Sequence, residues 1–334
     1  MRSLTAGLLA LALAAAGCSK SPIATTPKTI EPATAALSPP AETPPAGEVL
    51  PLGGNPQAAV MDAASGSLVV FTPGINGGEA NLTVFGHSEK PRNVRLPGPA
   101  SAVAAGGGSA YAATKGGFFT VDLAAGTATR TTVDGQQDTD FTAIARRADG
   151  RLVLGSADGK ALSLTADNTV AGKADVFARV DGLVAQGDTA VVLDRGQTSV
   201  TELRLDGAAG LSLRAGLGAT TIAADPMGRV LVTDTRGGQL LVFGVDPLIE
   251  RQAYPVGGAP YGITGSKTLV WVSLTASNTV VGYDLSTGIP VEKVRYPTVQ
   301  QPNALAFDDA TGTLYVVSAS GAGVQAIRNA GGTP

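Results

Sequence analysis

Residues 260–288 read PYGITGSKTLVWVSLTASNTVVGYDLSTG and contain most of one structural repeat. Three short runs of Val, Leu, Ile and aromatic residues, at 260–263, 269–272 and 279–283, are separated by turns rich in Gly, Ser, Thr and Asn. Short apolar runs bounded by turn residues predict β-strands. No apolar period of 3.6 residues lasts long enough to predict a helix. This stretch therefore predicts an all-β fold.

The first run of that stretch recurs along the chain. Its pattern is usually Pro or Ala, two further residues and an apolar residue, and the spacing between copies is 39 to 43 residues. Each copy is followed by a second and a third apolar strand and, before the last copy, by a more polar fourth strand. Four strands per repeat of about 40 residues predict a β-propeller, here with seven blades. The apolar residues that end the seven copies are Val60, Val103, Ile144, Leu183, Ile222, Ile263 and Leu305.

The seventh repeat reaches only its third strand before residue 334. Its missing outer strand is predicted at 48–52 (EVLPL), just before the first repeat. Pairing of that N-terminal strand with the last blade would close the ring and protect a sheet edge that would otherwise invite aggregation. The sequence thus predicts a single propeller domain over residues 47–334.

Cys18 is the only cysteine of the chain, and it follows Gly17 and the apolar stretch 4–16. That stretch is shorter than the ~20 residues that span a bilayer as a helix, so residues 1–17 are predicted to be a secretory signal peptide. Cys18 and the small residues before it resemble the lipobox of bacterial lipoproteins. The resemblance implies cleavage after Gly17, a diacylglyceryl group and often an N-acyl chain on Cys18, and anchoring on the extracytoplasmic side of the cell membrane. Cleavage elsewhere, as in an ordinary signal peptide, is the alternative.

Residues 18–46 are predicted to be a disordered tether that carries the lipidated Cys18 at its start. Seven prolines lie among Thr, Ser and Ala, and large apolar residues are few. Such a composition cannot bury enough apolar surface to build a core. Its proline density favours extended polyproline II stretches of ~3.1 Å per residue. We expect this segment to hold the propeller away from the bilayer, and O-linked sugar on its Thr residues is a further hypothesis.

Residues 271–288 resemble the repeat of YVTN-type β-propellers, and 232–234 and 315–318 are similar to weaker copies of it. From the lipobox to the last repeat, the chain also resembles a group of conserved mycobacterial envelope lipoproteins whose biochemical role is not established. The two resemblances imply a propeller fold and an envelope location. They imply no catalytic residues and no cofactor beyond the lipid on Cys18.

The residues that catalysis commonly needs are scarce. His87 is the only histidine, and a Ser-His-Asp mechanism or a histidine-based metal site would need it together with partners that the sequence does not offer. An exposed turn is the simpler interpretation of His87. The chain carries 24 Lys and Arg against 27 Asp and Glu, a net charge of −3, which argues against nucleic acid as a partner.

A candidate binding face is predicted from the loops of the propeller. The loop between the second and third strands of a blade shares one face with the connection that leads into the next innermost strand. Polar residues at these places could converge at the mouth of the central channel, or cap turns through their own backbone. Calcium takes six to eight oxygen ligands, and the oxygens here are too scattered to predict a metal site. The candidate residues are Asp140, Asp194, Arg195, Asp234, Arg236, Tyr261, Gln301 and Asn303.

Non-catalytic binding is the leading functional hypothesis. We expect a monomeric, membrane-anchored platform that recognises a protein, a peptide or a glycan of the cell envelope. The alternative is a hydrolase, lactonase or lyase that uses carboxylates at the channel mouth, with or without Ca²⁺. A purely structural envelope protein is the third class. Convergence of several carboxylates in the channel would favour the enzyme, whereas a shallow mixed surface would favour the binder.

Overall fold

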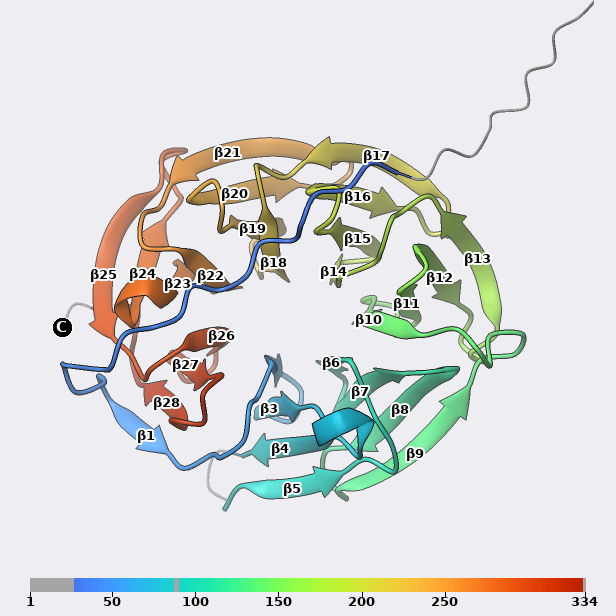
Figure 1. Ribbon diagram of the computed structural model, residues 1–334, viewed down its shortest axis with the longest axis horizontal. Coiled ribbons are helices and arrows are strands. Elements are labelled where there is room, and N and C mark those ends of the chain that lie inside the picture. The colour runs from blue at the N-terminus through green and yellow to red at the C-terminus, as the bar shows by residue number, and fades with distance from the viewer. Residues whose placement is uncertain (1–26, 87–89, 333–334) are drawn as a thin grey trace, which may run out of the picture.

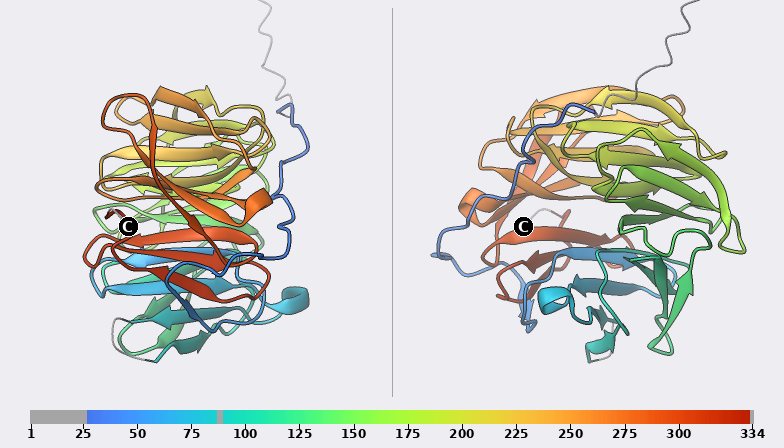
Figure 2. Two further views of the ribbon diagram at one scale, coloured as in Figure 1. Left: turned by 90° about the vertical axis from the view of Figure 1, so that its left-hand side faces the viewer. Right: turned by 45° about the vertical axis from the view of Figure 1, so that its right-hand side comes forward.

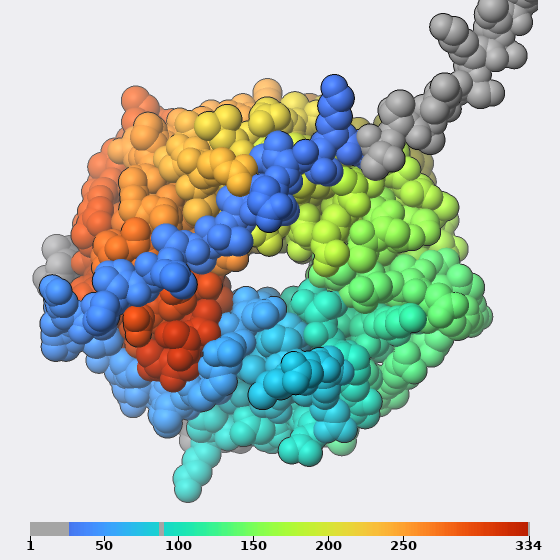
Figure 3. All heavy atoms as spheres, in the orientation of Figure 1, coloured from blue at the N-terminus to red at the C-terminus, as the bar shows by residue number. Residues whose placement is uncertain are grey.

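The computed structural model describes residues 27–86 and 90–332. Seven four-stranded antiparallel sheets form a ring. The ring surrounds a central opening, which is visible in Figures 1 and 3. The prediction of an all-β, seven-bladed propeller is confirmed. The described residues contain two short 3-10 helices, Ile75–Gly77 and Thr275–Ser277, and no helix among them is long and apolar enough to cross a membrane. Gly17, Cys18 and His87 lie outside the described residues.

Each blade runs in chain order from the centre of the ring to its rim. Blade 1 contains β2 (Ala58–Asp62), β3 (Ser67–Thr72), β4 (Asn81–Phe85) and β5 (Arg92–Arg95). Blade 2 contains β6 (Ala102–Gly106), β7 (Ser109–Thr114), β8 (Gly117–Asp122) and β9 (Thr127–Thr132). Blade 3 contains β10 (Phe141–Arg146), β11 (Leu152–Ser156), β12 (Lys160–Leu164) and β13 (Val170–Asp175). Blade 4 contains β14 (Gly182–Gln186), β15 (Thr189–Asp194), β16 (Ser199–Leu203) and β17 (Ala209–Arg214).

The remaining blades follow the same plan, except that the last takes its outer strand from the N-terminal side of the chain. Blade 5 contains β18 (Ala219–Ala224), β19 (Arg229–Asp234), β20 (Gln239–Gly244) and β21 (Ile249–Pro255). Blade 6 contains β22 (Pro260–Gly265), β23 (Val270–Leu274), β24 (Thr279–Asp284) and β25 (Val291–Pro297). Blade 7 contains β26 (Pro302–Asp308), β27 (Thr313–Ser318), β28 (Val324–Ile327) and β1 (Glu48–Leu50).

Ring closure occurs at the N-terminal strand that the sequence predicts, although this strand ends at Leu50 and not at Leu52. β1 pairs antiparallel with β28, with Glu48 opposite Ala326 and Leu50 opposite Val324. Just before β1, Gly47 has a φ of +72°, and a Cβ atom there would lie 2.3 Å from the carbonyl oxygen of Ala326. Only glycine meets both conditions without strain. Because β1 pairs with β28, the apolar strand β28 is not left as an open edge that could pair with another chain.

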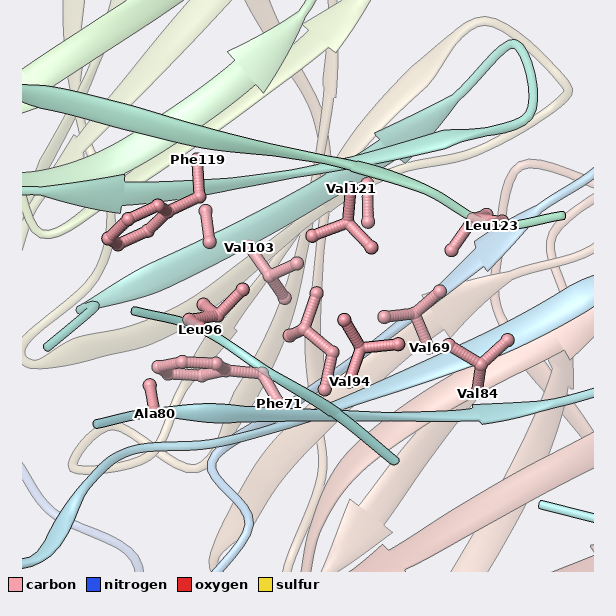
Figure 4. Packing of buried hydrophobic residues seen from close by; sticks show 13 residues of the cluster. Val69, Phe71, Ala80, Val84, Val94, Leu96, Val103, Phe119, Val121 and Leu123 are labelled. Atoms are coloured by element: carbon pink, nitrogen blue, oxygen red, sulfur yellow. The ribbon is translucent and has the colours of Figure 1, made fainter. Parts of the chain in front are cut away.

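The core lies between blades, since each sheet packs its face on the next. Figure 4 shows the cluster between blades 1 and 2, where Phe71 and Val94 of one sheet meet Phe119 and Val121 of the other. Full burial of one such side chain contributes about 1.5–3 kcal/mol. The second and third strands of the blades are almost entirely buried, whereas outer strands such as β9 and β17 are mostly exposed. This gradient explains why the fourth run of each repeat is the most polar.

Residues 27–46, which we call the strap, form neither helix nor strand. The strap crosses one face of the ring over blades 4, 5 and 6 before it enters β1 (Figures 1 and 2). Its composition predicts that it builds no core of its own, and the described part does not. It differs from the expected free tether because its backbone is hydrogen-bonded to the propeller. Side chains from four blades supply most of those bonds, and composition alone gives no sign of them.

Candidate functional site

The face under the strap is built from the two kinds of loop that the sequence analysis places together. Within blade 4, the Arg195 N–H donates to Asp181 Oδ2 over 2.8 Å, joining the loop after β15 to the connection before β14. In blade 7, Ser318 Oγ at the end of β27 donates to the Gln300 carbonyl over 2.6 Å. The loops after second strands and the connections into first strands therefore share one face.

Asp194 ends β15, and its side chain is fully buried. One carboxylate oxygen accepts the N–H groups of Ala178 and Arg179 over 2.7 and 3.2 Å, and the other accepts the N–H of Gln197 over 2.8 Å. Both oxygens are thus engaged by backbone of the same blade. The carboxylate lies beneath the face and holds two loops together.

Asp234 ends β19 in the same way and is also fully buried. It accepts the N–H groups of Leu217, Gly218 and Gly237, each over 2.8 Å. The last residue of the second strand makes comparable links in other blades, for example the bond of 2.6 Å from Thr114 Oγ1 to the Pro99 carbonyl. The contacts of the two aspartates are therefore those of turn capping, the alternative left open by their sequence positions.

Arg195 and Arg236 lie on the face and reach the strap. Arg195 Nη2 donates to the carbonyl of Ala33, and Arg236 Nη2 donates to the carbonyl of Glu31 over 2.7 Å. Arg236 also contacts the Leu217 carbonyl over 3.3 Å. Arg195 directly follows Asp194 in blade 4, whereas Arg236 lies two residues after Asp234 in blade 5, so both belong to the loop after the second strand of their blade. Both use their guanidinium groups to bind main-chain oxygens of the strap.

Gln301 and Asn303 lie at the start of blade 7 and act together. Gln301 Nε2 donates to the Ala36 carbonyl and to Asn303 Oδ1, both over 2.9 Å. Gln301 Oε1 accepts the N–H of Ser38 over 3.0 Å. The Gln301 amide thus bonds one carbonyl and one N–H group of the strap, and its hydrogen bond to Asn303 orients it.

Asn278, Gln300 and Thr275 complete the face and were not among the predicted residues. Asn278 Nδ2 donates to the Pro39 carbonyl over 2.7 Å, and Gln300 Nε2 donates to the Ser38 carbonyl over 3.3 Å. The Thr275 carbonyl accepts Ser38 Oγ over 2.6 Å. Asn278 has a φ of +47°, so its place in the Ser-Asn-Thr turn of blade 6 was the one available sequence signal.

Asp140 and Tyr261 take no part in the hydrogen bonds to the strap that the described residues show. Asp140 is exposed and leads into blade 3, whereas the strap crosses blades 4 to 6. Tyr261 is half-buried in β22, and its carbonyl accepts Thr233 Oγ1 of the neighbouring blade over 2.7 Å. The eight predicted residues thus divide into four around the strap, two beneath the face and two apart from it.

A groove of about 390 Å³ opens between blades 5 and 6. Tyr254 and Tyr283 form an edge-to-face pair in its wall, with ring centroids 5.8 Å apart. Burial raises the pKa of Tyr283 to about 12, and the nearby Glu292 adds to the rise. Glu292 and Arg295 form an ion pair of 2.7 Å at the outer end, and this pair lowers the pKa of Glu292.

The chemistry offered by this face is that of hydrogen bonding. Across residues 27–86 and 90–332, no group of three or more His, Cys, Asp or Glu side chains could hold a metal ion. The side chains that donate to the strap carry guanidinium and amide groups, which bind its carbonyl oxygens. This arrangement suits recognition of a polypeptide backbone.

No family model and no curated protein matches the chain. Solved structures with the same architecture include a streptogramin B lyase, at 11% identity and a TM-score of 0.67, covering 85% of this chain and 96% of that one. A chain of a mitotic checkpoint complex aligns at 14% identity and 0.70, covering 89% and 98%. The WD40 repeats of RRP9 align at 14% and 0.68, covering 85% and 98%. Identities this low show the fold alone.

Proposed function

We propose that the protein is a membrane-anchored envelope lipoprotein whose propeller binds a protein or peptide partner on the face under the strap. One observation carries the proposal: side chains of successive blades donate to the backbone carbonyls of an extended segment. Propellers commonly serve as binding scaffolds, and the similar structures include a chain of a mitotic checkpoint complex. A glycan partner is less favoured, because the side-chain donors of this face bind peptide carbonyl oxygens of the strap.

The anchor is proposed from the residues around Cys18. A diacylglyceryl thioether there would hold the mature protein at the extracytoplasmic side of the cell membrane, and more than one acyl chain is needed for stable anchoring. The intact mass of the mature protein tests this directly, since it would begin at Cys18 and carry lipid. A Cys18→Ser variant would be released from the membrane fraction.

No specific observation favours the carboxylate-based hydrolase, lactonase or lyase. The two aspartates that would have served it, Asp194 and Asp234, use both carboxylate oxygens to hold backbone N–H groups. The likeness to a streptogramin B lyase, at 11% identity, extends to the fold and brings no residue with it. The geometry therefore favours binding over catalysis.

Cross-linking in intact cells, followed by affinity capture and mass spectrometry, tests the platform. We expect a reproducible envelope partner that is lost when Arg195→Ala and Gln301→Ala are combined. Lys267→Ala is the matched control, because Lys267 is exposed in the loop between β22 and β23 on the opposite face. A partner retained by the double variant, or lost equally with Lys267→Ala, would argue against this face.

A further inference from the structure

We propose that the face under the strap is an exchangeable binding surface for an extended, proline-containing polypeptide, and that residues 29–40 are its ligand in cis. The partner in trans would carry the same features: a small residue, a serine five positions later, and prolines that keep the chain extended. The inference rests on the proposed binding function and names the class of partner for it.

The face under the strap binds main-chain atoms of the strap. The carbonyl oxygens of Glu31, Ala33, Ala36, Ser38 and Pro39 all accept hydrogen bonds from propeller side chains. Within residues 29–40, two N–H groups are also bound, since Ile30 donates to the Gly196 carbonyl over 2.8 Å and Ser38 donates to Gln301 Oε1. Because the donors address peptide groups, a second segment with the same backbone course would satisfy them equally.

Two strap positions add side-chain selectivity. Ala33 is only 7% exposed, and a Cβ atom placed on Gly218 would lie 3.1 Å from the Ala33 Cβ, so the space admits only a small residue. Ser38 Oγ donates to the Thr275 carbonyl over 2.6 Å, so an oxygen donor is wanted there. Leu37, between them, is 91% exposed and free to vary.

The prolines fit this form of recognition. Proline has no N–H, so Pro32, Pro39 and Pro40 leave no donor unsatisfied in a site that supplies donors of its own. A proline-rich segment is already extended before it binds, which lowers the conformational entropy lost on docking. Domains that bind proline-rich peptides in aromatic-lined grooves exploit the same low entropy of a preformed polyproline II helix. We therefore expect a partner that competes with the strap to have a similar proline-containing sequence.

The strap can leave without unfolding the propeller. Within residues 27–46 only Ala33 is buried, and the strap contributes no strand to a sheet. The seven buried core clusters of the described chain contain no strap residue, apart from partial packing by Ala46 at its end. A tethered segment acts at an effective concentration on the order of millimolar, so a partner must compete with it.

The test uses a fluorescent peptide of residues 28–41 (KTIEPATAALSPPA) and the full chain bearing Cys18→Ser. Ala33→Phe in the chain should undock the strap, because the buried site cannot hold the ring, and should tighten peptide binding at least tenfold over the parent. Leu37→Phe is the matched control, with the same new side chain at an exposed position, and should bind the peptide as weakly as the parent. A peptide that itself carries Ala33→Phe should fail to bind.

Two further variants locate the site and guard against misfolding. Adding Arg195→Ala and Gln301→Ala to the Ala33→Phe chain should abolish peptide binding. If Ala33→Phe does not fold, Ser38→Pro, which removes both the N–H and the hydroxyl donor of Ser38, replaces it. Equal peptide affinity of the parent and a folded, undocking variant would overturn the inference. If cellular capture still depends on Arg195 and Gln301 in that case, the proposed function stands and only the class of partner is wrong.

Discussion

Asp234 shows at the level of a single residue how the face is held in shape. Its buried carboxylate accepts three backbone N–H groups, from Leu217, Gly218 and Gly237. Asp234→Ala would leave those donors without a partner, at about 1–3 kcal/mol for each buried group. We expect a loss of about 3 kcal/mol or more in the free energy of unfolding, measured by denaturant titration. The matched change Asp140→Ala, at an exposed aspartate, should cost less than about 0.5 kcal/mol.

A comparable loss in both aspartate variants would contradict the assignment of Asp234 as a buried brace. Loss of partner capture with Asp234→Ala and full stability would instead restore it as a binding residue. Stability and partner capture together distinguish turn capping from ligand binding. Sequence position alone cannot do so, because a carboxylate at the end of a strand suits either role.

Tyr283 is expected to make the stability of the propeller fall at alkaline pH. Its phenol pKa is raised from 10 to about 12, so the folded state keeps a proton that the unfolded state loses between those values. The stabilisation is complete below pH 10 and is lost as the pH rises towards about 12. We expect the denaturation midpoint to fall over that window, and to fall less in Tyr283→Phe. An identical pH profile in the variant would show that Tyr283 does not couple to folding.

At the level of elements, β1 closes the ring through a connection that requires glycine. Gly47→Ala would place a methyl group 2.3 Å from the Ala326 carbonyl at a φ of +72°. We expect a loss of about 2 kcal/mol or more in stability. Gly53→Ala, after β1, is the control, since a Cβ atom there meets nothing within 4 Å. Thermal unfolding of both variants decides the matter, and equal midpoints would mean that β1 adds little to closure.

The repeats were predictable because the apolar runs of each blade must recur at the spacing of the sheets that they build. The closing strand was predictable because blade 7 lacks an outer strand and residues 48–50 lie just before blade 1. The docking of the strap was not predictable. Its bonds come from side chains such as Arg195, 162 residues from Ala33, and they go to peptide carbonyls that every sequence carries. Composition reveals that a segment lacks a core, but not that a distant surface binds it.

At the level of the whole molecule, the strap lies between the proposed binding face and the proposed anchor. The strap occupies residues 27–46, so with the strap docked only residues 18–26 remain between a lipidated Cys18 and the propeller. Even a fully extended chain of that length spans at most about 30 Å. If a partner displaces the strap, residues 18–46 become available, and their extended length rises to about 90 Å at ~3.1 Å per residue. Partner binding would then allow the propeller to move away from the membrane.

The distance between the propeller and the membrane can be measured by fluorescence energy transfer. The donor dye lies in the bilayer, and the acceptor dye is attached at the C-terminus of the lipidated protein. We expect transfer to be high in the parent and in Leu37→Phe, whose strap stays docked. Transfer should fall in Ala33→Phe, and in the parent once saturating peptide of residues 28–41 is added. Unchanged transfer in Ala33→Phe, with lipidation verified by mass, would mean that undocking does not lengthen the tether. Because the strap is both the ligand of the face and part of the tether, occupation of the face and distance from the membrane should change together.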